Sequence, residues 1–152
     1  MGKSPKKFTM ANVSCRHISE ERMKFVHYNM LFLRDQFMIK GKMNVFIEDA
    51  YMLDGAKGVC EYSKKSGQID ISFKALYVKQ TDKRELADTM IHEIMHSSQY
   101  ETGRMIDVTG TNITIFDGKE YNRKGMSYDA YPWEIEANLV SENTRLLELI
   151  LS

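Results

Sequence analysis

Two histidines four residues apart, with a glutamate directly after the first, constrain this chain more than any other feature. His92, Glu93 and His96 stand in the run HEIMH, inside the longer segment TDKRELADTMIHEIMHSSQY. Side chains four residues apart lie on one face of a helix, so both imidazoles can reach one metal ion. Glu93 lies about 100° further round, where it can hold a water molecule beside the metal. The motif therefore predicts a helix with a zinc site and with Glu93 as general base.

The apolar residues of this helix leave one side free for the histidines. The apolar arc consists of Ala87, Met90, Ile91, Ile94 and Met95. His92 lies roughly opposite the centre of that arc, with His96 beside it. We expect the helix to bury its apolar side and to present the metal ligands on the other. The competing interpretation is a pair of exposed histidines on an ordinary amphipathic helix.

A catalytic zinc site needs a third protein ligand, and no histidine follows His96. Gln99 and Thr102 stand where the pattern HExxHxxGxxH would have glycine and histidine, which excludes that arrangement. A downstream carboxylate is therefore the best candidate, as in sites with two histidines and one glutamate. On the predicted C-terminal helix, Glu134 lies opposite the apolar arc and Glu136 lies within it. We assign Glu134 as the third ligand, and Glu136 is the alternative.

Further side chains near the expected site have candidate roles. Asn138 lies one helical turn after Glu134 and is expected to orient a ligand histidine. Tyr131 directly precedes the same helix, and its phenol is a candidate for stabilising an oxyanion. Arg104, just after the HEIMH helix, is a second candidate for that role. The competing interpretation for any tyrosine here is packing against neighbouring side chains.

The whole chain of 152 residues reads as one α+β domain. Periodicity and capping residues, with Ser19 as the N-cap of the first helix, predict three helices, over about residues 20–39, 81–100 and 132–152. Runs of β-formers predict a small three-stranded sheet, over residues 43–50, 58–63 and 68–73. Asp117-Gly118 predicts a hairpin between the second and third helices. The basic residues 1–17 are expected to form a loosely ordered tail.

Charge and cysteine content narrow the partners and the compartment. Lys and Arg together number 21, and so do Asp and Glu, so no net field favours nucleic acid or an anionic membrane. No apolar run of about 18 residues and no signal-peptide core is present, so we expect no membrane association. Cys15 and Cys60 are far apart and suit reduced thiols. We therefore expect a cytoplasmic protein with a protein or peptide partner.

The two motifs together resemble the gluzincin class of metallopeptidases. HEIMH is followed by the run ExEAN at Glu134–Asn138, which looks most like the ImmA/IrrE-type metallopeptidases among small domains. The lead GVCEYSKKSGQIDISFKAL also resembles SprT-like domains and small phage-encoded zincins. The resemblance implies a zincin-like fold, one Zn²⁺ per chain and possible origin in a phage of a bacterial host. The histidine-glycine motif of SprT-like proteins and a separate DNA-binding domain are missing here, which leaves the substrate open.

The combined interpretation is a zinc-dependent endopeptidase. Zinc would be held by His92, His96 and Glu134, and Glu93 would move the proton. One alternative is a catalytically silent zincin-fold module that binds or regulates a partner, with metal only joining two helices. Another is metal-assisted hydrolysis of a non-peptide amide.

Overall fold

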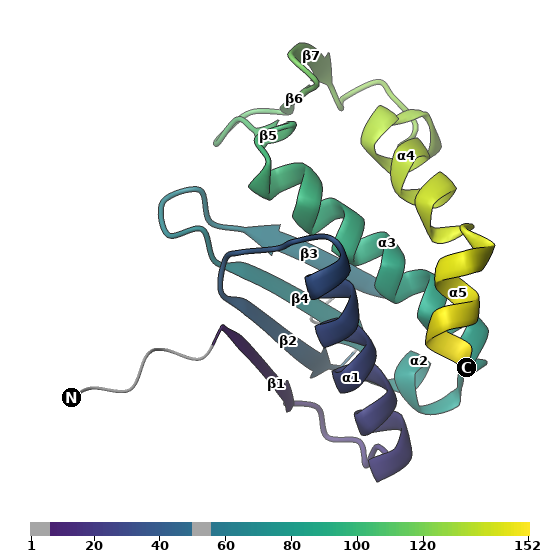
Figure 1. The fold of residues 1–152 in the computed structure, drawn as a ribbon. Coiled ribbons are helices and arrows are strands. Elements are labelled where there is room, and N and C mark those ends of the chain that lie inside the picture. The colour runs from purple at the N-terminus through teal and green to yellow at the C-terminus, as the bar shows by residue number, and fades with distance from the viewer. Residues whose placement is uncertain (1–6, 50–55) are drawn as a thin grey trace.

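The computed structural model describes residues 7–49 and 56–152 and confirms the α+β class (Figure 1). The helices are α1 (Glu20–Gln36), α2 (Ala75–Gln80), α3 (Lys83–Glu101), α4 (Pro132–Ser141) and α5 (Thr144–Leu151). The strands are β1 (Phe8–Asn12), β2 (Met43–Glu48), β3 (Gly58–Tyr62), β4 (Ile69–Lys74), β5 (Met105–Asp107), β6 (Ile113–Phe116) and β7 (Lys119–Asn122). Within the described ranges, no helix is both long enough and apolar enough to cross a membrane.

The larger sheet is mixed and has the strand order β1-β2-β4-β3. β1, β2 and β4 run parallel, whereas β3 is antiparallel to β4 and forms one edge. Alternate residues of β2 and β4 are fully buried and form one core with α1 and α3, as β2 shows with Met43, Val45 and Ile47. Both long helices therefore cover the same face of the sheet, and α3 runs beside the edge strand β3 (Figure 1).

Capping side chains fix where the two long helices begin. Ser19 accepts a hydrogen bond from the backbone N–H of Arg22 at 3.2 Å and starts α1, as the sequence predicts. Asp82 does the same for α3 through Arg84 at 2.9 Å. With its start fixed, α3 presents a long apolar side to the core and carries the HEIMH segment along the sheet.

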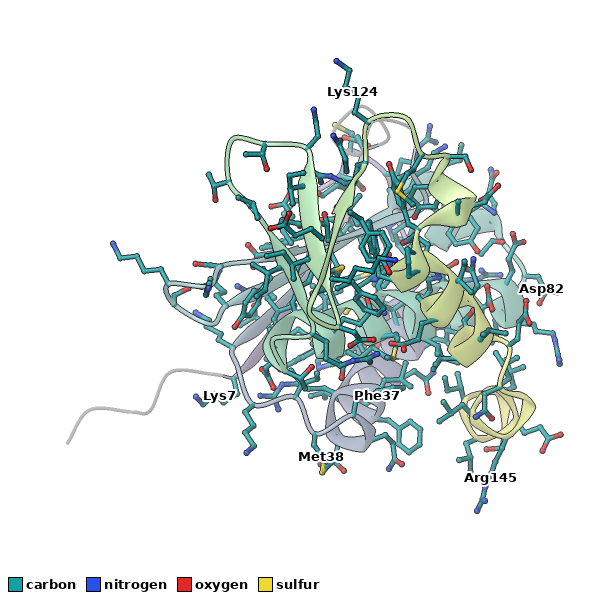
Figure 2. The ribbon with its side chains drawn as sticks, turned by 90° about the horizontal axis from the view of Figure 1, so that it is seen from above. Lys7, Phe37, Met38, Asp82, Lys124 and Arg145 are labelled. Carbon is teal, nitrogen blue, oxygen red and sulfur yellow. The ribbon has the colours of Figure 1, made fainter. Side chains whose placement is uncertain are left out.

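The second sheet, β5-β6-β7, is antiparallel and follows directly after α3. Asp117 and Gly118 both have positive φ, 50° and 81°, as a two-residue hairpin turn of this kind requires. A small separate core joins this sheet to the start of α4, because Trp133 packs against Met105 and Phe116. Seen from above, the sheet lies beside α4 (Figure 2). It therefore supports the helix on which Glu134 lies.

The N-terminal region and the strand count differ from the sequence prediction. Residues 8–12 of the expected tail form β1, which pairs in parallel with β2 from Phe8–Met43 to Asn12–Ile47. Residues 1–6 of that expected tail, and Ala50 of the predicted strand 43–50, lie outside the described residues. The prediction of a three-stranded sheet is thus wrong: within residues 7–49 and 56–152 the main sheet has four strands, and the hairpin belongs to a second sheet of three.

The helix ends also differ from the prediction. α1 ends at Gln36, and Met38 has a φ of 52°, which stops the helix before residue 39 (Figure 2). The expected C-terminal helix is two helices, α4 and α5. Asn143 separates them, because its side chain accepts the N–H groups of Arg145 and Leu146 and so starts α5. The short helix α2 was not expected from the sequence.

A matched pair of leucines tests the position of the core. Leu33 of α1 is fully buried, whereas Leu139 of α4 is 66% exposed. We expect Leu33→Ala to lower the free energy of unfolding by about 2–5 kcal/mol, since it leaves a cavity. Leu139→Ala should change it by less than about 0.5 kcal/mol. Urea denaturation of both variants measures the difference, and equal losses would contradict this packing.

Candidate metal centre

α3 and α4 pack side by side and bring together three side chains that can hold a metal ion. His92 and His96 come from α3, and Glu134 comes from the first turn of α4. One ligand atom from each lies within 4.8 Å of the others. His96 and Glu134 are buried, and His92 is partly exposed. The group is thus enclosed on two sides and open on the side of His92.

The separations within this group are close to those of a tetrahedral zinc site. Two ligand atoms that lie about 2.0–2.1 Å from one zinc ion lie about 3.3–3.4 Å from each other. His96 Nε2 lies 3.1 Å from His92 Nε2 and 3.1 Å from Glu134 Oε2, and His92 Nε2 lies 3.4 Å from Glu134 Oε1. The contact of His96 Nε2 with Glu134 Oε1 is closer, at 2.5 Å. Glu134 therefore has to turn slightly to share a zinc ion with His96.

The electrostatics of the group favour a bound cation. Burial alone raises the pKa of the Glu134 carboxyl, but hydrogen bonds from His92 and His96 outweigh it and lower the pKa to about 2. Burial alone lowers the pKa of His96, yet its contact with the Glu134 carboxylate raises it overall. The carboxylate is thus ionised, and a proton on His96 competes for the position that a metal ion would take.

Glu93 lies beside the group without belonging to it. Its side chain is 4% exposed, and burial raises its pKa against the opposing effect of the two histidines. It also touches the edge strand: a Cβ atom added at Gly58 would lie 3.2 Å from both Cγ and Oε2 of Glu93. The missing side chain at Gly58 therefore lets β3 approach the predicted general base closely.

Gln99 orients His96, a role that the sequence analysis did not give it. Its Oε1 atom lies 2.8 Å from His96 Nδ1, and its amide nitrogen donates to the backbone oxygen of Trp133 at 3.1 Å. It is fully buried. A partner at Nδ1 fixes the ring and leaves Nε2 facing the metal position. The available signal was its position, three residues after His96 on the same side of the helix.

Asn138 does not have the role that was predicted for it. Its side chain is exposed, and among the described residues it makes no hydrogen bond. The buried side of α4 consists of Trp133, Glu134, Ala137 and Ser141. Asn138 follows Glu134 by one turn but lies further from the centre of that buried side. The rotation of α4 thus points Glu134 at the histidines and Asn138 at solvent.

Tyr131 also lies elsewhere, and Tyr128 is the tyrosine that influences Glu134. Tyr131 stacks on Trp133 with 4.8 Å between ring centroids, and its hydroxyl donates to the backbone oxygen of Arg123. Tyr128 lies in the 3-10 turn before α4. It is 62% exposed, and partial burial together with the nearby Glu134 carboxylate raises the pKa of its phenol. Tyr128 therefore remains protonated and can donate a hydrogen bond beside the metal position.

Glu136 and Arg104 bind each other instead of facing the metal position. Both terminal nitrogens of Arg104 lie 2.7 Å from Glu136 oxygens, and Arg104 also pairs with Asp117 of the hairpin. The hydrogen bonds from Arg104 lower the pKa of Glu136. The two residues therefore tie α4 to the second sheet. Among the described residues, the group that can hold a metal contains Glu134 and not Glu136.

We expect the two glutamates of α4 to differ in their effect on zinc binding. Wild-type protein, purified without a metal-affinity tag, should take up one zinc ion per chain. Glu134→Ala should weaken zinc binding by more than the roughly 10–100-fold that an outer partner costs. Glu136→Ala should keep zinc and lose some stability. Elemental analysis and competition with a coloured chelator measure both, and zinc loss in Glu136→Ala alone would reverse the assignment.

A second pair of variants tests the support of His96. Gln99→Met has nearly the same size but cannot bond Nδ1, so zinc affinity should fall by about 10–100-fold. Asn138→Ala should leave the affinity unchanged, because that side chain points to solvent. The same chelator competition measures both variants. Equal affinities for the two would mean that Gln99 does not orient the ligand.

Comparison of the chain with protein-family models, with curated proteins and with solved structures gives no significant match.

Proposed function

We propose that this protein is a zinc-dependent endopeptidase with a zincin-like fold. The observation that carries the proposal is one constellation: His92, His96 and Glu134 together, with buried Glu93 directly beside them. Two imidazoles and one carboxylate are the ligands of several catalytic zinc sites, in which the fourth position is left for water or substrate. A purely structural zinc site has four protein ligands, and only three converge among the described residues.

Each residue has a defined task in this reaction. When bound, zinc would polarise the scissile carbonyl and make water more acidic. Glu93 takes the proton from the attacking water and delivers it to the leaving amine. Gln99 keeps His96 in the orientation that leaves Nε2 free. Tyr128, whose phenol lies near Glu134 and keeps its proton, is a candidate donor for the oxyanion in place of Tyr131.

The edge of β3 supports a peptide substrate. The backbone N–H of Lys74 donates to the backbone oxygen of Lys57, and that of Ser63 donates to the backbone oxygen of Gln68. Lys57 and Ser63 are therefore in hydrogen-bonded pairs of the β3–β4 ladder. Because such pairs alternate along an antiparallel ladder, the backbone groups of Gly58, Cys60 and Tyr62 point away from β4. An extended peptide can pair with this edge as an added strand. It would then lie along α3, with Gly58 placing it beside Glu93.

The decisive variant is Glu93→Gln. Glutamine has nearly the same shape but cannot accept a proton from water, so zinc should stay bound while turnover falls by about 10²–10⁴-fold. Zinc content, circular dichroism and cleavage of an unfolded protein such as reduced casein, or of a peptide library, are measured on both forms. Leu139→Ala, an exposed change on α4, serves as the control with unchanged turnover.

The competing interpretation, a silent binding module, gives the opposite result. A zinc-loaded wild type that cleaves neither the unfolded protein nor the library would contradict the endopeptidase. If wild type and Glu93→Gln then capture the same partner equally well, the binding module is the better description.

A further inference from the structure

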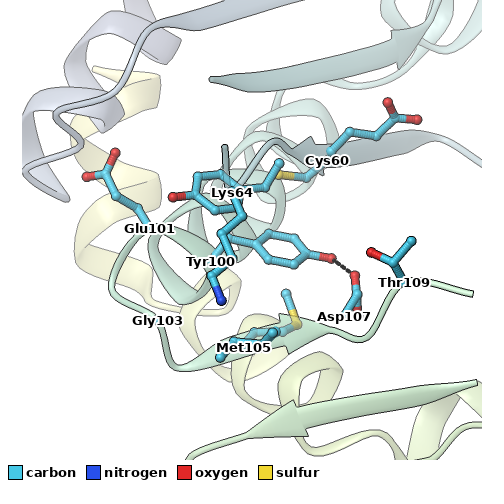
Figure 3. A pocket seen from close by; sticks show the side chains of 11 residues that line it. Cys60, Lys64, Tyr100, Glu101, Gly103, Met105, Asp107 and Thr109 are labelled. Atoms are coloured by element: carbon cyan, nitrogen blue, oxygen red, sulfur yellow. Dashed lines mark hydrogen bonds between the residues drawn. The ribbon is translucent and has the colours of Figure 1, made fainter. Parts of the chain in front are cut away.

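A pocket of about 630 Å³ lies at the end of α3 (Figure 3), and none of the metal-centre residues lines it. One wall is the second half of β3, from Cys60 onward, and the opposite wall is β5. The last turns of α3 supply Tyr100, which lies between the two walls (Figure 3). β3 runs from Gly58, which lies beside Glu93, to this pocket. Between the two, the side chain of Cys60 lies 3.5 Å from that of Ser97 on α3.

Both walls of the pocket are strand edges without a partner among the described residues. Next to β5, the backbone N–H of Asp117 donates to the backbone oxygen of Arg104, and the backbone N–H of Val108 donates to the backbone oxygen of Ile113. Because such pairs alternate, the backbone groups of Met105 and Asp107 point away from β6. On β3, those of Cys60 and Tyr62 point away from β4. All four outward-pointing residues line the pocket. A peptide backbone in this position can therefore form hydrogen bonds to a strand on either side.

The carboxylate of Asp107 lies at the pocket wall with unused capacity for hydrogen bonds. The Tyr100 hydroxyl donates to one oxygen at 2.6 Å, and Thr114 donates to the other at 2.7 Å. A carboxylate has about four lone-pair sites, so two bonds leave room for a further donor. Arg123 is the nearest cation, but its guanidinium is 4.0 Å away and bonds the backbone oxygens of Thr111 and Asn112.

Aromatic rings and the Asp107 carboxylate complete the pocket. Tyr62 and Tyr100 stack with 5.6 Å between centroids and 13° between planes. Among the lining carboxylates, Glu101 already accepts the backbone N–H groups of Lys40 and Gly41, which leaves Asp107 as the one with free lone pairs beside Tyr100. A long cationic side chain suits these surroundings, because its stem can pack on the rings while its charged end meets a carboxylate.

We propose that this pocket binds a lysine or arginine side chain of an extended peptide whose backbone pairs with β3 and β5. Asp107 is the residue that recognises the charge, and Tyr100 holds Asp107 in place. The inference rests on the proposed function insofar as this peptide is the substrate. The basic residue would then fix which peptide bond lies beside Glu93.

Binding is tested without turnover, on the full-length Glu93→Gln protein loaded with zinc. The probes are acetylated, amidated octapeptides of alanine and serine that carry one central Arg, Lys, Phe or Glu. Amide shifts in ¹⁵N NMR spectra report where each peptide binds and how tightly. We expect the Arg and Lys peptides to bind at least about fivefold more tightly than the Glu peptide, as for a partly exposed ion pair. The shifted amides should be those of Cys60, Tyr62, Met105 and Asp107.

Two variants that remove the same charge at different places provide the control. Adding Asp107→Asn should abolish the preference for Arg and Lys, whereas Asp35→Asn, at an exposed position near the end of α1, should preserve it. The proposal is overturned if the Phe or Glu peptide binds as tightly as the Arg peptide, or if the shifts lie elsewhere. Cleavage by wild type is measured separately. If basic peptides bind but none is cleaved, the endopeptidase proposal is contradicted and the proposal for the pocket is retained.

Discussion

The contact between the first turn of α4 and the middle of α3 is the interaction on which the rest of this structure depends. It buries the charged Glu134 carboxylate against two imidazoles. Removing a single charge from water costs several kcal/mol unless an opposite charge compensates it. Here a proton on a histidine or a metal ion supplies that charge. Gln99 strengthens the contact, since one side chain bonds a ligand of α3 and the backbone of α4. The same contacts therefore pack α4 against α3 and bring the three candidate ligands together.

Each of the two sheets supports one of the helices in this contact. The larger sheet buries the apolar side of α3, which turns its histidines away from the core. The smaller sheet supports α4 through the ring of Trp133, which packs against Phe116 and Tyr121. Arg104 adds a polar tie by pairing with Asp117 of the hairpin and Glu136 of α4. The carboxylate that competed with Glu134 in the sequence thus helps to hold Glu134 in position.

Local patterns in the sequence predicted much of this arrangement, and β1 shows where they fail. The Ser19 cap, the HEIMH helix and the Asp117-Gly118 hairpin depend on neighbouring residues alone, and all three are present. β1 was missed because its pairing with β2 joins segments about thirty-five residues apart, and FTMAN carries no local signal of it.

A helical wheel has the same limit at the centre. It shows which residues of α4 share a face, but the angle at which α4 meets α3 decides whether Asn138 reaches a histidine. That angle depends on Trp133 and the second sheet, which no local pattern describes. The wheel also says nothing about the turn before α4, where Tyr131 stacks on Trp133 and Tyr128 is the tyrosine near Glu134.

The bare backbone at Gly58 has a consequence for how such an enzyme would choose its bond. Because Gly58 has no side chain, the side chain of Glu93 lies directly against the backbone of β3. Gly58 therefore offers no side chain that could select one substrate residue over another. The proposed pocket for a basic side chain begins at Cys60, two residues or about 7 Å further along an extended strand. The length of β3 would then set the distance between the bound basic residue and the cleaved bond. That distance would be fixed, whatever the sequence at the cut itself.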